Sequence, residues 1–193
     1  MKAIVNFFIN TLIKNMFFIK VDGRENIPQN GPVILCVNHT SNFDPLVLRT
    51  QIKREINFLA KKECFENKII AFLLKKFNAI PVDRNKNDLS AYKNTMRKLK
   101  DKEVIGIFIQ GTRKKDNNFD QAKNGAAMFA IKSNTPIVPV AIKSNFKLFS
   151  KVMINIGKPI YFNNLDTKKF NREILNQATE KITNQIKLLL ESV

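Results

Sequence analysis

Two residues in the first quarter of the chain have the types and spacing for acid–base chemistry. His39 is the only histidine, and the carboxylate of Asp44 follows it five residues later. Imidazole is the side chain whose ordinary pKa lies nearest to neutral pH, so His39 is the first candidate for a general base. A general base commonly needs a partner that orients its ring, and Asp44 is the candidate for that role.

Asp44 also has a purely structural interpretation. It precedes Pro45 and the apolar run 46–48. An aspartate at the N-cap with a proline at the first helical position is a strong signal for the start of a helix. This interpretation explains Asp44 without any chemistry but gives no reason for the histidine, so both interpretations stay open at the level of the sequence.

The elements that would position these residues alternate along the chain. Strand-like segments occur at 21–28, where a short strand leads into turns, and at 32–37, 56–60, 79–82, 104–109, 137–142 and 152–156. Helical patterns lie at 44–53, 68–77, 88–100, 124–133 and 167–190. Strands that alternate with helices are typical of an α/β domain whose mostly parallel central sheet is flanked by helices.

The carboxyl ends of two strands should bring the polar segments together. His39 follows the buried apolar strand 32–37, and Gly111-Thr112-Arg113 follows the second such strand, 104–109. Ligands of open α/β sheets bind beyond the carboxyl ends of the strands. If the two strands are parallel neighbours, both segments lie at the same edge of the sheet.

The composition indicates one globular domain with an affinity for anions. The 193 residues carry 33 Lys and Arg against 16 Asp and Glu, a net charge of +17. Such a surface favours nucleic acid, an acidic membrane face or phosphorylated metabolites, although a lysine-rich composition alone would also produce it. No nucleic-acid-binding motif is present, so we expect no nucleic acid partner. With a single histidine and two distant cysteines, Cys36 and Cys64, we expect no metal site, and the isolated cysteines favour a reducing compartment.

Residues 1–20 predict an amphipathic helix of unusual proportions. A narrow polar stripe formed by Lys2, Asn6, Asn10 and Lys14 faces a broad apolar surface that includes Phe7 and Phe8. The stripe interrupts the apolar run too often for a membrane span, and no signal-peptide cleavage pattern follows. The helix either packs into the core or lies in a membrane interface, and the phenylalanines on a basic chain favour the membrane.

Four ordered blocks of sequence carry a family resemblance. They are Asn38 to Asp44, with the pattern Asn-His-x-x-x-x-Asp; 61–63 followed by 79–84; Phe108 to Arg113; and 123–127 followed by 136–140. In this order and spacing they resemble the lysophosphatidic acid acyltransferases (1-acylglycerol-3-phosphate O-acyltransferases), and the likeness extends from about Gly23 to Pro159. The resemblance implies a glycerolphosphate-acyltransferase-like α/β fold for residues 21–193, with residues 1–20 as a membrane-association helix.

The resemblance also assigns roles to individual residues. It implies that His39 is the general base for the hydroxyl of the acceptor and that Asp44 holds its ring. The phosphate of lysophosphatidic acid would be held by Arg113, assisted by Arg84 and Lys123. In the third block, Gly111 would let the backbone approach the ligand closely and Thr112 would add a hydroxyl.

The third block departs from the family pattern at two positions. Ile109 stands where the family usually has proline, which should alter only the turn, and Gln110 stands where it usually has glutamate. Gln110, which we place among the substrate-binding residues, keeps the shape and hydrogen bonding but lacks the charge. Three interpretations follow: an active enzyme for lysophosphatidic acid, the same chemistry on glycerol 3-phosphate or another lysolipid, or a catalytically silent lipid-binding protein.

The partners implied by the resemblance complete the expectation. The acyl donor would be acyl carrier protein or coenzyme A as a thioester co-substrate, with no other cofactor. The acceptor would be a lysophospholipid, and the product phosphatidic acid. The basic surface and the N-terminal helix would hold the protein peripherally at an anionic membrane, on the cytoplasmic face.

Overall fold

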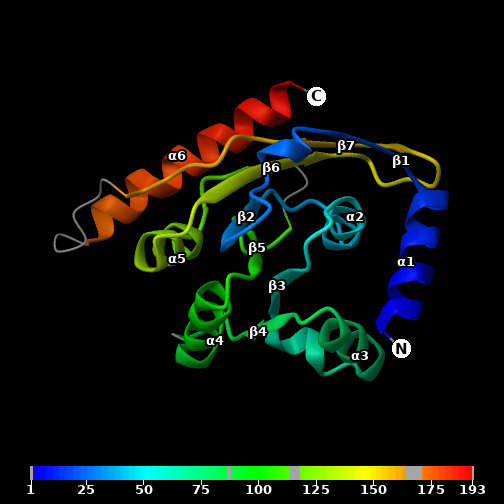
Figure 1. Cartoon of the computed structure of the whole chain (residues 1–193), viewed down its shortest axis with the longest axis horizontal. Helices are drawn as coiled ribbons and strands as arrows, with labels where there is room; N and C mark the ends of the chain where they lie inside the picture. Colours follow the sequence, from blue (N-terminus) through cyan, green and yellow to red (C-terminus); the bar gives the residue numbers. More distant parts are fainter. Residues whose placement is uncertain (1, 87, 114–117, 164–170, 193) are drawn as a thin grey trace.

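A seven-stranded sheet organises the chain (Figure 1). The computed structural model describes residues 2–86, 88–113, 118–163 and 171–192. The strands are β1 (Phe18–Asp22), β2 (Val33–Val37), β3 (Ile56–Lys61), β4 (Ile80–Val82), β5 (Val104–Phe108), β6 (Ile137–Lys143) and β7 (Lys151–Ile156). Their order in the sheet is β1-β7-β6-β2-β5-β3-β4, and every neighbouring pair is parallel except β6 with β7. The predicted mostly parallel α/β domain is therefore confirmed.

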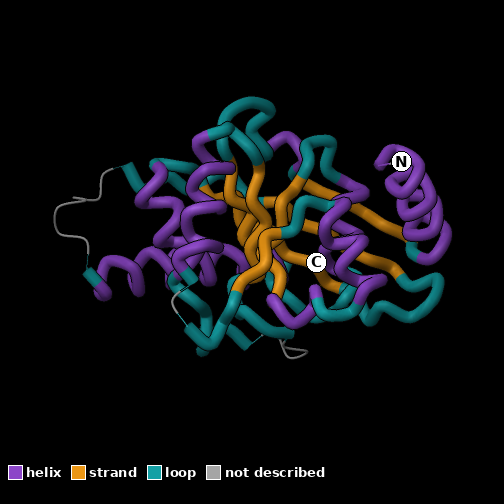
Figure 2. Tube along the Cα trace, turned by 90° about the horizontal axis from the view of Figure 1, so that it is seen from below, coloured by secondary structure: helices purple, strands orange, loops and turns teal. Residues whose placement is uncertain are grey.

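Helices cover both faces of the sheet (Figure 2). They are α1 (Lys2–Met16), α2 (Asp44–Gln51), α3 (Lys68–Lys76), α4 (Leu89–Lys100), α5 (Gly125–Ser133) and α6 (Arg172–Glu191), with 3-10 turns η1 (Arg24–Asn26) and η2 (Lys62–Phe65). The helices α4, α5 and α6 pack on one face, whereas α1 and α2 pack on the other. The central strand β2 is buried at every residue, which explains its uninterrupted apolar sequence.

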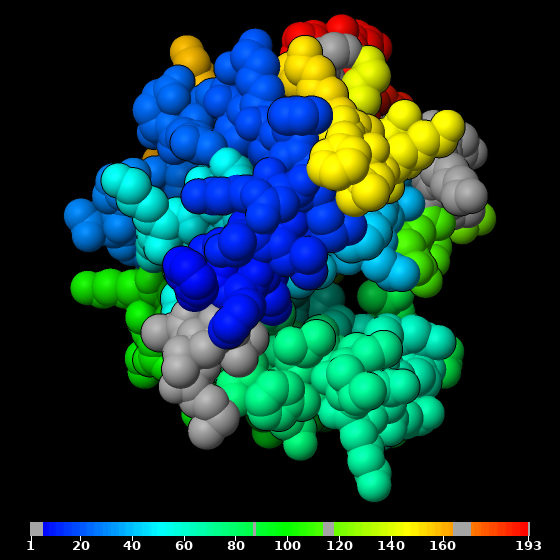
Figure 3. Space-filling model, turned by 90° about the vertical axis from the view of Figure 1, so that its right-hand side faces the viewer, coloured from blue at the N-terminus to red at the C-terminus, as the bar shows by residue number. Residues whose placement is uncertain are grey.

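The two chain ends differ slightly from the predicted elements. The N-terminal helix ends at Met16, and Phe18–Asp22 joins β7 as a parallel strand rather than prolonging the helix. Figure 3 shows α1, in blue, lying across one side of the molecule. The C-terminal helix begins at Arg172, where the side chain of Asn171 caps it by accepting from the amide of Ile174 at 2.9 Å. Of the helix predicted over 167–190, residues 167–170 lie outside the described part of the chain.

Pro139 occupies a position that its residue type argues against. A proline in a strand usually marks an edge, but β6 lies inside the sheet, between β2 and β7. Pairing of β6 with β7 begins only at Val140, and a separate bridge joins Ile137 to Ile160. Pro139 therefore lies in an interior strand, at a point where the ladder to β7 is interrupted.

Candidate active site

The candidate site lies where two central strands end side by side. Strands β2 and β5 are parallel neighbours in a register that places Val37 opposite Phe108, and the amide of Ile109 donates to the carbonyl of Val37 at 3.0 Å. The segments that follow these strands, from His39 and from Gly111, consequently share one edge of the sheet. This is the juxtaposition that the sequence predicts.

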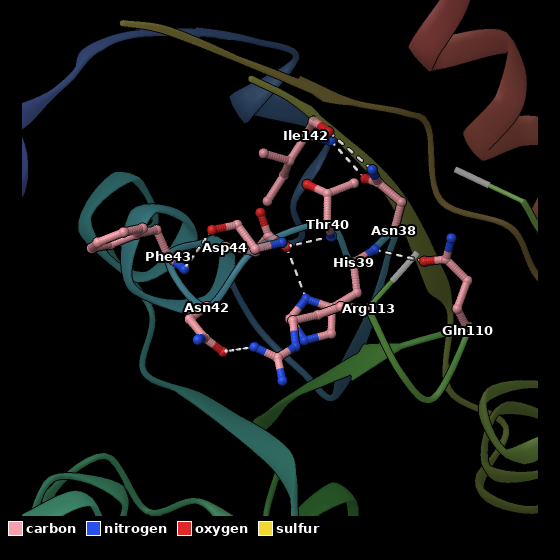
Figure 4. A network of polar contacts seen from close by, with 10 residues as sticks. Asn38, His39, Thr40, Asn42, Phe43, Asp44, Gln110, Arg113 and Ile142 are labelled. Carbon is pink, nitrogen blue, oxygen red and sulfur yellow. Dashed lines mark hydrogen bonds and ion pairs between the residues drawn. The ribbon is translucent and has the colours of Figure 1, made fainter. Parts of the chain in front are cut away.

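A buried carboxylate holds the imidazole of His39 (Figure 4). The Nδ1 atom of His39 lies 2.8 Å from Oδ2 of Asp44, whose side chain is fully buried, while the His39 side chain keeps 16% of its surface exposed. The same carboxylate oxygen accepts from the backbone amides of Thr40 and Ser41, each at 2.8 Å. A carboxylate in this position requires the proton on Nδ1 of the neutral ring. The Nε2 atom therefore carries the lone pair that can accept a proton.

Asp44 does not act as the helix cap that its sequence context suggests. Phe43 is the N-cap of α2, so Asp44 and Pro45 occupy the first helical turn. The carboxylate turns back to the preceding loop and accepts from the amides of Thr40 and Ser41 and from the ring of His39. The N-cap interpretation is wrong in detail: Asp44 begins the helix, but its hydrogen bonds organise the loop that contains His39.

Asn38 fixes the point from which this loop departs. Its buried side chain donates from Nδ2 to the carbonyl of Ile142 at 2.9 Å and accepts at Oδ1 from the amide of Ile142 at 2.7 Å. These paired bonds continue the β2–β6 contact beyond the end of the ladder at Val37 and Val140. The chain thus leaves the sheet in a fixed direction directly before His39.

Aromatic side chains support the imidazole from one side. The rings of His39 and Phe108 are stacked with centroids 4.0 Å apart, and Phe108 is stacked in turn on Phe58 at 5.6 Å. Gly106 makes room for this column, because a Cβ atom there would lie 2.4 Å from the ring of Phe58. With one ring face covered and Nδ1 bonded, the orientation of His39 is fixed by two independent contacts.

Gln110 joins the two loops from inside the protein. Its Oε1 atom accepts from the backbone amide of His39 at 2.6 Å, and its Nε2 atom donates to the carbonyl of Asn118 at 3.2 Å. Only 2% of its surface is exposed. A carboxylate could accept the first of these bonds but could not donate the second. The amide therefore suits this site in both of its hydrogen-bonding functions, and the side chain faces protein atoms rather than open solvent.

The two residues at the outer end of the third block are exposed. Arg113 donates from Nη1 to Oδ1 of Asn42 at 2.6 Å, which links the loop after β5 to the loop after β2 (Figure 4). Both Arg113 and its neighbour Thr112 are accessible to solvent. The guanidinium carries five donors in a planar fork, so most of its capacity remains for an anionic ligand beside His39.

Two further cationic residues meet at Gly111. This glycine has a φ of +67°, in the left-handed region, and its amide donates to the carbonyl of Phe108 at 2.9 Å. Arg84 donates to the carbonyl of Gly111, and the side chain of Lys123 passes over it, since a Cβ atom there would lie 3.3 Å from the Cγ atom of Lys123. Desolvation lowers the pKa of Arg84, but a guanidinium stays charged at neutral pH.

The structure therefore gathers the predicted residues into one site. His39 and Asp44 form a hydrogen-bonded pair, and Arg84, Gly111 and Lys123 meet at the neighbouring loop with Thr112 and Arg113. Gln110 lies beneath them, bonded to the backbone of His39. Such an arrangement can accept a proton at Nε2 while a cationic rim binds an anion. In the part of the chain that the structure describes, no group of three or more His, Cys, Asp or Glu could hold a metal ion.

Three residues of this site carry no predicted role. Asn38, Asn42 and Phe108 all lie inside the matched blocks, but sequence reasoning gives them no function. The paired bonds of Asn38 depend on β6, and the bond of Asn42 depends on the loop after β5, so both partners are distant in sequence. The one available signal is position: Asn38 directly precedes His39, Asn42 lies between His39 and Asp44, and Phe108 ends a buried strand.

Comparisons with known proteins agree on the family. A family model described as Acyltransferase matches residues 18–143. The chain is 33% identical over 180 residues to the 1-acyl-sn-glycerol-3-phosphate acyltransferase of Bacillus subtilis, with 87% of this chain and 89% of the relative covered. It is 28% identical over 181 residues to the enzyme of the same name from Borreliella burgdorferi, with 91% and 72% covered.

A solved structure agrees on the fold. The crystal structure of the 1-acyl-sn-glycerophosphate acyltransferase PlsC from Thermotoga maritima superposes with a TM-score of 0.70 at 22% identity, covering 96% of this chain and 81% of that one. Together with the sequence matches, this agrees with the family that the four sequence blocks indicate.

Proposed function

Because the chain belongs to the family of 1-acyl-sn-glycerol-3-phosphate acyltransferases, we propose that it transfers a fatty acyl group from a thioester to the free hydroxyl of lysophosphatidic acid. The product would be phosphatidic acid, for phospholipid biosynthesis. One observation carries the proposal: a lone, partly exposed histidine is held by a buried carboxylate, and cationic side chains stand beside it. The donor would be acyl carrier protein or coenzyme A in thioester linkage, with no other cofactor.

The reaction follows from the state of His39. Nε2 accepts the proton of the acceptor hydroxyl as its oxygen attacks the thioester carbonyl, and a C–O bond forms. The tetrahedral intermediate then expels the thiolate by breaking the C–S bond, and the imidazolium transfers the proton from the acceptor hydroxyl to the thiolate. Asp44 stabilises the imidazolium from the attack of the hydroxyl until the thiolate leaves. General-base assistance of this kind contributes about 10²- to 10⁴-fold to the rate.

The acceptor would be oriented by its phosphate. Arg113 lies at the rim beside Asn42, and Arg84 and Lys123 converge on Gly111. A guanidinium binds phosphate through two parallel hydrogen bonds, which fixes direction as well as affinity. A phosphate at this rim would direct the glycerol hydroxyl of the acceptor toward His39.

The hydrogen bonds of Gln110 favour an active enzyme over a silent lipid-binding protein. The glutamine keeps the bond to the amide of His39 and gains one to Asn118, so the loop remains fixed in the absence of the family carboxylate. The imidazole also keeps both of its supports, Asp44 and Phe108. We therefore infer that the change from glutamate to glutamine leaves the acyl-transfer machinery complete.

We place the protein peripherally at the cytoplasmic face of a membrane, and the orientation of α1 supports the contact with a lipid surface. Phe7 and Phe8 are 67% and 66% exposed, whereas the polar residue Asn6 is half-buried and accepts from Arg49 at 3.4 Å. The last turn packs on the domain through Ile13. A helix that turns its phenylalanines outward is suited to an apolar interface. No helix in the described residues has the length and apolar character to cross a bilayer.

The test is acyl transfer by the purified protein, with vesicles that contain lysophosphatidic acid. Acyl carrier protein and coenzyme A thioesters are supplied separately, and glycerol 3-phosphate competes as the second acceptor. Phosphatidic acid as the main product supports the proposal. Acylation of glycerol 3-phosphate alone would change the acceptor, and absence of any acyl product with both donors would overturn the proposed activity.

A further inference from the structure

The helix α3 turns an apolar surface toward solvent. Ile69, Ile70 and Phe72 are 75%, 47% and 48% exposed, and Ala71 is the one buried residue of the helix. The helix is nevertheless well defined, since the side chain of Asn67 caps it by accepting from the amides of Ile69 and Ile70, each at 3.1 Å. A capped helix that leaves large apolar side chains exposed needs an occupant for that surface.

Cationic side chains frame this apolar surface. Lys68 and Lys75 each lie about one helical turn from Phe72, on the same side of the helix, and the ammonium of Lys76 lies 5.5 Å from the centre of the Phe72 ring. The α3 helix contains no acidic residue. A central aromatic ring with lysines around it matches a surface that is apolar inside and anionic at its boundary.

The same side of the molecule carries two other exposed apolar segments. Figure 3 shows α3, in green, below α1, in blue, with the segment before β7, in yellow, beside α1. In that segment Leu148 and Phe149 are each 62% exposed, and the amide of Phe149 donates to the carbonyl of Met16 at the end of α1 at 2.7 Å. The segment is thus fastened to α1, and three parts of the chain that are far apart in sequence and contain exposed apolar residues lie on the side of the molecule seen in Figure 3.

We propose that α3 is a second bilayer contact, which acts together with α1 when the protein docks on an anionic membrane. Ile69 and Phe72 would enter the boundary of the acyl chains, and Lys68, Lys75 and Lys76 would lie among the headgroups. Two separate helices and the exposed segment at Leu148 and Phe149 would give contacts at different points of the surface, so the bilayer would restrict the orientation of the protein as well as attach it. The inference rests on the proposed function for the choice of a lipid surface, and it adds the segment and the orientation.

The composition of the chain allows a direct test, because it contains no tryptophan. An Ile69→Trp variant therefore carries a single fluorescent reporter on α3. The control is Leu188→Trp, because Leu188 is 57% exposed on α6, and Figure 1 shows α6 far from α3. Both variants are mixed with vesicles of phosphatidylglycerol and phosphatidylcholine and, separately, with phosphatidylcholine alone.

We expect a blue shift and protection from iodide quenching for the α3 reporter on anionic vesicles, and no change for the α6 reporter. Cosedimentation of the protein with vesicles while the α3 reporter stays accessible would overturn the proposal, since α1 would then bind alone. A blue shift without vesicles that grows with protein concentration would also overturn it, because α3 would then be a contact between copies of the chain.

A pair of polar variants gives the size of the effect. Ile69→Asn combined with Phe72→Asn should weaken partitioning to anionic vesicles by roughly tenfold to a hundredfold. Leu188→Asn should leave it unchanged, and equal binding by the α3 double variant and the wild type would contradict the proposal. None of these binding assays needs turnover. A failure of the proposed acyl transfer is therefore distinguishable from a failure of the α3 contact.

Discussion

The two loops that follow β2 and β5 lie side by side but are built differently. In the first, His39 is held by a fully buried carboxylate and a stacked ring, and Asn38 fixes the exit from the strand. In the second, Arg113 is exposed and donates a hydrogen bond to Asn42. Proton transfer needs a base whose accepting nitrogen is held in one position, whereas phosphate binding needs cationic side chains that a ligand can reach. The difference between the loops therefore matches the two tasks of an acyltransferase with a phosphorylated acceptor.

Substitutions in the loop after β2 should have the larger effects on the rate of acyl transfer, and Asp44→Asn should have the largest of those considered in this loop besides loss of His39 itself. The amide lacks the negative charge and can present an N–H to His39, which favours the tautomer with the proton on Nε2. We expect kcat to fall by about 10²- to 10⁴-fold. Rates should be measured below the melting temperature of the variant, with a thermal melt to establish that it is folded. A folded variant with wild-type kcat would contradict the role of Asp44.

Substitutions in the loop after β5 should mainly lower the affinity for the acceptor substrate. We expect Arg113→Ala to lower kcat/KM for lysophosphatidic acid by roughly 10- to 100-fold, chiefly through a higher KM, because one charge-assisted contact is lost. The matched control is Arg97→Ala, which removes the same charge from an exposed site on α4. An equal loss of kcat/KM in the two variants would mean that only the net charge of the protein matters. It would contradict the phosphate-binding role of the loop after β5.

The smallest effect should come from restoring the family residue. In Gln110→Glu the carboxylate can still accept from His39, but its second oxygen faces the carbonyl of Asn118. We expect a loss of about 1–3 kcal/mol in the free energy of unfolding at neutral pH. We also expect lower activity rather than a gain.

The pH dependence of this variant sharpens the test. The neutral acid can donate to Asn118, so the folded state should raise the pKa of the new carboxyl above its unfolded value of about 4.3. The loss of unfolding free energy relative to wild type should then grow as the pH rises above about 4.3, toward the raised pKa of the folded state. It should vanish at lower pH, where the carboxyl is protonated in both the folded and the unfolded protein. Gln121→Glu, at an exposed position, is the charge control. A deficit independent of pH, or higher activity in Gln110→Glu, would contradict the role assigned to the amide.

Much of the fold is predictable because its central strands are buried on both faces. The uninterrupted apolar runs of β2 and β5 have few alternatives to a parallel position at the centre of a sheet, and the structure places them there as neighbours. The position of β1 is not predictable in the same way. Phe18 continues the apolar pattern of α1, and only pairing with the distant β7 makes the segment a strand.

The residues of the site also differ in whether local sequence or a distant partner determines their role. His39 and Asp44 are candidates by their residue types and spacing, whereas the roles of Arg84, Arg113 and Lys123 come from the family resemblance. The carboxylate of Asp44 has the same sequence signal as a helix cap, and only the closed loop shows that it bonds to His39. The role of Gln110 depends on the carbonyl of Asn118, a backbone atom to which no sequence pattern points.

The central claim is that His39 removes the proton of the acceptor hydroxyl, and the most direct test is the single-turnover rate of acyl transfer in a His39→Ala variant. Wild type and variant are compared on the same vesicles with lysophosphatidic acid at saturation, after thermal melts have established that both are folded. We expect the rate of the variant to be lower by about 10²-fold or more, since the general base is lost. A folded His39→Ala variant that forms phosphatidic acid at the wild-type rate would contradict the mechanism.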